Sequence, residues 1–356
     1  MPLVVNLAII ISSLTIIGFY YFIYPSVVHK KRIITTMMQF YKKREFGAFI
    51  TDSFNFFKLY GKNYFKNYIL INGLLLILTI AVVIFGFKEI FGQLVGSNMS
   101  GESYYFERYF EDNSGMLIVA GILVFVLFIL LAIVNYLYPV FYMKRIAEGA
   151  QKIKTDEILG DFKRNAGRIF KMGIGMLFIV FPVTMIIVGF SYVLLLIIIG
   201  FFLILLVYPT AFNVSAFLMY DYFNAKRGFM ESLSYSIRSQ FSYPNGNEKS
   251  PYWKYWGASI IMFVILYVVS LVFTMVPMVF VYGSVLTSTP DGNFEENPFA
   301  GTAGIIFFVF YGISMLASLF LSNLMFINAG LMYYDSRTDL HQKAELEEIE
   351  TIGINE

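Results

Sequence analysis

The chain alternates between long uncharged apolar runs and shorter segments that carry almost all of the charge. A helix of about 20 apolar residues crosses the ~30 Å hydrocarbon layer of a bilayer. The run 172–220 is long enough to cross twice, and we predict a tight turn within it at Gly189-Phe190-Ser191. The pattern therefore predicts seven spans, from the runs 3–24, 68–87, 115–142, 172–220 (two spans), 257–282 and 301–333.

The segment 46–66 has the periodicity of an amphipathic helix. At about 100° per residue, its apolar face opposes a face carrying Lys58, Lys62 and Lys66. One interpretation is a helix in the membrane interface, with these lysines contacting anionic lipid headgroups. The other is a helix packed on the bundle, because both share the same pattern. The residues of the apolar face are Phe46, Phe49, Ile50, Phe54, Phe57, Tyr60 and Tyr64.

Two further amphipathic segments each precede an uncharged run. One lies within residues 144–171, and the other carries the apolar stripe Phe229, Met230, Leu233 and Ile237. A short match between Asp52-Ser53-Phe54 and Glu231-Ser232-Leu233 supports a repeated unit. We therefore predict an all-α polytopic membrane helix bundle of six to seven spans, built from units of interfacial amphipathic helix plus transmembrane hairpin.

The ends of the chain define the predicted domain limits. Residues 1–36 are either an N-terminal transmembrane anchor or precede the true start, at Met37 or Met38, and a targeting peptide is a further interpretation. Residues 37–336 form the six-span membrane domain. Residues 337–356 form an acidic tail, which we expect to be cytoplasmic.

The distribution of charge predicts the orientation. Of the 26 Lys and Arg residues, all but Lys88 and Arg108 fall in segments that this topology places on one side, namely residues 25–66, 141–171, 221–256 and 334–356. Cytoplasmic loops carry the excess of Lys and Arg. We expect a multi-pass protein of a bacterial inner membrane with its C-terminus in the cytoplasm.

Composition removes several kinds of chemistry. The chain has 58% hydrophobic and 14% charged residues, no cysteine and two histidines. Disulfides, thiolate metal sites and cysteine nucleophiles are therefore excluded. No span contains an ionisable residue, as coupled transport usually requires. We expect no catalytic residues, no metal, no cofactor and no nucleic-acid partner, and hence no enzyme.

Polar residues inside the spans are the remaining candidates for a site. Asn213 and Asn323 would be costly facing lipid, and they serve either to hydrogen-bond neighbouring helices or to line an intramembrane polar site. Asn213 follows Pro209 and Thr210, a grouping that would suit a broken helix beside a transport site. Proline kinks are also ordinary in membrane bundles.

One stretch also carries a family resemblance. The segment Gly228-Phe229-Met230-Glu231-Ser232-Leu233-x-x-Ser236, followed by Trp253-Lys254-Tyr255-Trp256-Gly257, resembles bacterial multi-pass proteins related to the glycerophosphodiester phosphodiesterase membrane domain. The resemblance covers roughly residues 40–336. It implies a six-helix plan with no catalytic residues in the membrane domain. The insertion Pro244-Asn245-Gly246-Asn247-Glu248-Lys249 departs from the family spacing.

Two functions fit these observations. The first is a non-enzymatic scaffold or assembly factor for a membrane complex, contacting anionic lipids and a protein partner through its cytoplasmic loops or tail. The alternative is a transporter, channel or lipid-handling protein with a site between the hairpins, near Asn213 and Asn323.

Overall fold

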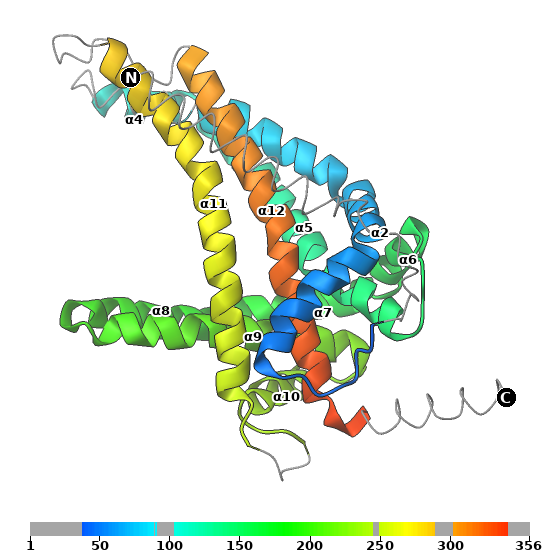
Figure 1. The fold of residues 1–356 in the computed structure, drawn as a ribbon. Coiled ribbons are helices and arrows are strands. Elements are labelled where there is room, and N and C mark those ends of the chain that lie inside the picture. The colour runs from blue at the N-terminus through cyan, green and yellow to red at the C-terminus, as the bar shows by residue number, and fades with distance from the viewer. Residues whose placement is uncertain (1–37, 89, 91–102, 245–248, 289–301, 341–356) are drawn as a thin grey trace, which may run out of the picture. The chain divides into compact units, whose positions relative to one another are not determined.

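A computed structural model describes residues 38–88, 90, 103–244, 249–288 and 302–340 (Figure 1). All regular secondary structure in these ranges is helical, which confirms the all-α class. The elements are α2 (Phe46–Ala81) continued by the π-helix η1 (Val82–Phe87), α4 (Ser103–Asp112), α5 (Ser114–Ala147), α6 (Thr155–Arg164), α7 (Ala166–Gly175) continued by η2 (Met176–Val180), α8 (Phe181–Val193), the 3-10 turn η3 (Leu194–Ile197), α9 (Ile199–Asn224), α10 (Phe229–Phe241), α11 (Tyr252–Ser288) and α12 (Thr302–Ser336).

The described chain contains 6 helical stretches long and apolar enough to cross a membrane. They are Phe46–Phe87, Ser114–Ala147, Ala166–Val193, Ile199–Asn224, Tyr252–Met275 and Gly304–Ser336. The polytopic bundle is therefore confirmed for the six-span part of the chain. The predicted first span, within residues 1–36, and residues 341–356 of the predicted tail lie outside the described residues.

The chain divides into two compact units. The first includes residues 69–135 and 265–322, with parts of four spans, and polar contacts join α5, α11 and α12 within it. The Asn135 side-chain amide on α5 lies 3.2 Å from the Ser322 hydroxyl on α12. The Ser314 hydroxyl of α12 donates to the Phe273 carbonyl of α11 at 2.7 Å. Lipid tails are as apolar as the side chains on a helix, so the hydrophobic effect does not favour helix–helix contact inside a bilayer. Interhelical hydrogen bonds such as these therefore help to hold the helices together.

The second unit includes residues 29–68, 136–264 and 323–356, of which 38–68, 136–244, 249–264 and 323–340 are described. Its core is unusually rich in buried tyrosine. Tyr64 of α2 donates to the Asn323 side-chain carbonyl at 2.6 Å, while its ring packs edge-on against Tyr138 and Tyr142 of α5. Each buried hydroxyl needs a partner, so these tyrosines pair helices specifically as well as fill volume.

Helix α2 runs without interruption from the first amphipathic segment into the apolar run. No proline or glycine stands at the predicted junction near residue 67, so nothing in the sequence ends the helix there. Phe49, Phe56 and Tyr64 are fully buried within the second unit, and the Asn328 side-chain amide donates to the Phe49 carbonyl at 3.1 Å. For this segment, side-chain burial favours the interpretation of a helix packed on the bundle.

The turn between the third and fourth crossings lies later than predicted. Residues 189–191 are inside α8, so the predicted turn at Gly189-Phe190-Ser191 is wrong. The chain reverses through η3 and Ile198, which has a left-handed φ of 65°. Gly200 allows this close reversal, because a Cβ there would lie 2.1 Å from the Ser191 carbonyl oxygen. Helices α8 and α9 then lie side by side as a hairpin (Figure 1).

Candidate functional site

Helix α10 forms the most distinctive surface of the second unit. The helix follows Gly228, whose backbone N–H donates to the Glu231 carboxylate at 3.1 Å. This contact satisfies one of the free donors at the helix start. At the other end, the Ser242 N–H donates to the Arg238 carbonyl at 3.0 Å. The sequence therefore sets both ends of a short, separate helix that packs on α9 and α7.

The fully buried residues of α10 are polar, and three of the four are serines. They are Ser232, Ser236, Ser239 and Gln240. Two of these serines satisfy their buried hydroxyls with backbone carbonyls of the same helix. Ser236 donates to the Leu233 carbonyl at 2.8 Å, and Ser239 donates to the Ser236 carbonyl at 3.2 Å. Small side chains also let helices approach closely, as in membrane bundles.

The predicted apolar stripe of α10 divides in the structure. Phe229 and Leu233 are half-buried, and the Phe229 ring packs against Gly175 of α7. The outward part, called the stripe from here on, consists of Met230, Ile237 and Phe241. Met230, Ile237 and Phe241 are 60%, 45% and 52% exposed. Arg238 and Glu231 lie exposed at one edge of this stripe. A helix that packs on protein mainly through serines and leaves part of its apolar face exposed is suited to a membrane interface.

An apolar groove borders one side of the stripe. Its volume is about 440 Å³, within the range of about 300–1,000 Å³ that holds small ligands. The few polar groups in the groove include the Thr210 hydroxyl, which donates to the Leu206 carbonyl at 2.7 Å and lies 3.2 Å from the Tyr252 hydroxyl. The lining comes from η2, α8, α9, α10 and the start of α11, and consists of Ile179, Val180, Val183, Thr184, Ile187, Leu206, Val207, Thr210, Ala211, Val214, Leu233, Ile237 and Tyr252.

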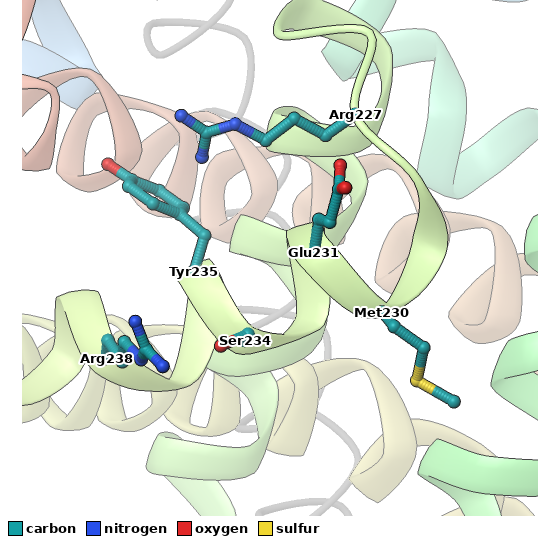
Figure 2. Close-up of a pocket in the computed structure, with 6 residues that line it drawn as sticks. All are labelled: Arg227, Met230, Glu231, Ser234, Tyr235 and Arg238. Carbon is teal, nitrogen blue, oxygen red and sulfur yellow. The ribbon is translucent and has the colours of Figure 1, made fainter.

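A shallow, open depression of about 520 Å³ lies on the other side of the stripe; we call it the polar cavity because most of its residues are polar, and Figure 2 shows them. It is lined by Arg227, Met230, Glu231, Ser234, Tyr235 and Arg238. The Arg227 guanidinium lies 4.9 Å from the centre of the Tyr235 ring, and the Tyr235 hydroxyl is 2.8 Å from that of Ser336. Burial raises the pKa of Tyr235 above its ordinary value.

The protein contains a buried carboxylate near α10, and the sequence pattern did not indicate it as a site. Asp221, at the end of α9, is fully buried. Arg227 lies 3.4 Å from its carboxylate and Arg337 3.7 Å, while the Tyr333 hydroxyl donates to it at 3.4 Å. The only available signal was an acidic residue directly after a long apolar run.

A second buried carboxylate, Asp335 near the end of α12, joins three segments. It accepts hydrogen bonds from Lys254 at 2.9 Å, from the Tyr255 hydroxyl at 2.6 Å and from the Tyr243 hydroxyl at 3.1 Å. The Arg44 backbone N–H also donates to it. A buried charge with this many partners fixes the segments around it.

The residues proposed from the sequence lie apart from these two cavities. Lys58, Lys62 and Lys66 are exposed on α2, as headgroup contacts would require. Asn213 accepts a hydrogen bond from Ser259 of α11 at 2.7 Å, whereas Asn323 accepts one from Tyr64 of α2. The two asparagines therefore bond to different helices. Pro209 does not break α9, which continues through it.

Comparisons with family models, with curated proteins and with solved structures give no match. The six apolar helices define the class of the protein, an integral membrane protein of the multi-pass helical type. The resemblance to the glycerophosphodiester phosphodiesterase membrane domain stays a prediction.

Proposed function

We propose that this protein is a non-enzymatic, phospholipid-binding membrane protein that holds an acyl chain in the groove between α8, α9 and α10. The observation that carries the proposal is the outward apolar stripe of α10 next to that groove. This proposal selects the lipid-handling alternative among the functions that the sequence suggested.

A scaffold function is compatible with lipid binding but has less support. The acidic run Glu345–Glu350, which a partner would contact in that interpretation, lies outside the described residues. The groove and the stripe, in contrast, are formed by described side chains. A bacterial inner membrane with the C-terminus in the cytoplasm is the proposed location, and the segregation of Lys and Arg supports that orientation.

Photolabelling tests this function. The full-length protein in detergent is mixed with a few equivalents of phosphatidylcholine carrying a diazirine in its acyl chain, and cross-linked residues are mapped by mass spectrometry. We expect labelling concentrated on groove residues such as Val183, Ile187 and Ile237. Ala211→Phe, which fills the groove from α9, should reduce that labelling several-fold, because the chain loses its volume.

Ala120→Phe is the matched control, since Ala120 is exposed on α5 and away from the groove lining. It should leave labelling of the groove unchanged. Equal labelling of exposed apolar residues on all spans, with no effect of Ala211→Phe, would contradict the proposed function.

A further inference from the structure

We propose that the polar cavity beside α10 binds the phosphate of an anionic phospholipid, through Arg227, Arg238 and the Ser234 hydroxyl. This inference rests on the proposed function and names the lipid class. The cavity and the groove lie on either side of the same apolar stripe, and Met230 belongs to both the stripe and the cavity. An amphiphile with a charged head therefore fits this surface better than a soluble anion does.

Two cavity donors are available to a ligand. The Arg238 side chain is exposed and makes no ion pair in the described chain, and the Ser234 hydroxyl makes no hydrogen bond there. Figure 2 shows the side chains of Arg227 and Arg238 on either side of Tyr235. Arginines and a hydroxyl are the groups that proteins commonly use to bind phosphate oxygens.

Two of the three nearby carboxylates are paired with arginines, whereas the third, Glu231, lines the cavity and is held by a backbone N–H. The Glu231 carboxylate accepts from the Gly228 N–H, Asp221 is shared between Arg227 and Arg337, and Asp339 pairs with Arg337 at 2.8 Å. The three negative charges equal the three positive charges of Arg227, Arg337 and Arg238 in number, but Glu231 and Arg238 form no ion pair in the described chain.

Two further cations, neither of them in the cavity lining, lie next to Arg227 and add positive charge. Arg168 donates to the backbone carbonyls of Tyr222 and Arg227, and its guanidinium lies 4.1 Å from the centre of the Tyr222 ring. These partners are uncharged, so they do not neutralise the positive charge of Arg168. Lys226, next to Arg227, is exposed. This excess favours an anionic head over a zwitterionic one.

Native mass spectrometry of the full-length protein tests the headgroup. The probes are dioleoyl phosphatidylglycerol and dioleoyl phosphatidylcholine, which have the same chains and differ in headgroup charge. The wild type should retain more phosphatidylglycerol. Arg238→Ala should weaken phosphatidylglycerol binding about five-fold and phosphatidylcholine binding less, because both lipids carry the phosphate but only phosphatidylglycerol has a net negative headgroup. Arg238→Lys should recover most of the preference.

Arg108→Ala is the matched control, because Arg108 is an exposed arginine on α4, 61% accessible. It should bind both lipids like the wild type. Equal binding of the two lipids by the wild type, or an unchanged preference in Arg238→Ala, would overturn the headgroup assignment. So would displacement of phosphatidylglycerol by an equal concentration of glycerol 3-phosphate, which has no acyl chain. Acyl-chain labelling of the groove would survive any of these failures, so the proposed function is judged separately.

Discussion

At the scale of single residues, the buried carboxylates are what a reading of the sequence misses. Asn213 and Asn323 stand out because amides are rare inside apolar runs, and both do bond across helices. Asp221 and Asp335 look like the first polar residues of a loop. Their burial depends on partners far along the chain, such as Lys254, which lies 81 residues from Asp335. Hydropathy along the chain contains no information about such partners.

Removing the Asp335 carboxylate should destabilise the second unit strongly. Asp335→Ala takes away the acceptor that lies 2.9 Å from Lys254, and breaking a buried ion pair costs about 3–5 kcal/mol. The measurement is the free energy of unfolding in mixed micelles. Asp112→Ala is the control, because its pair with Arg108 is exposed and is expected to contribute under about 1 kcal/mol. Similar losses in both variants would show that the Asp335 network is not structural.

At the scale of elements, periodicity predicted the helices well but could not say what covers each face. The first amphipathic segment buries Phe49 and Tyr64 in protein, whereas α10 buries Ser232 and Ser236 and leaves Ile237 bare. Both patterns have the same period. The direction each apolar face takes depends on which neighbours offer a complementary surface. The position of the turn after α8 depends similarly on the close approach at Gly200.

The two faces of α10 should respond to substitution in opposite ways. Ser236→Leu places a larger side chain against α9 and should cost about 1–3 kcal/mol through overpacking. Ile237→Ser should leave unfolding in detergent nearly unchanged, yet weaken docking of α10 at the bilayer. Thermal unfolding and limited proteolysis in vesicles measure the two effects. A large loss of stability in Ile237→Ser with tolerance of Ser236→Leu would mean that the apolar face is the packed one.

At the scale of the whole molecule, the class and the six crossings follow from sequence because the bilayer imposes a length and satisfies no backbone hydrogen bond. Runs such as 115–142 therefore correspond closely to helices such as α5. The groove and the polar cavity could not be predicted in this way. They arise where α8, α9 and α10 meet, and the separate residues that line them show no periodicity of their own. The charge-based orientation stays a prediction.

The central claim, that this protein holds a phospholipid beside α10, is tested most directly by a cryo-electron microscopy map of the full-length protein in nanodiscs containing phosphatidylglycerol. The account predicts elongated density in the groove between α8, α9 and α10, continuing over the stripe to headgroup density beside Arg238. A map that resolves α10 clearly, with the groove empty or closed by side chains, would contradict it.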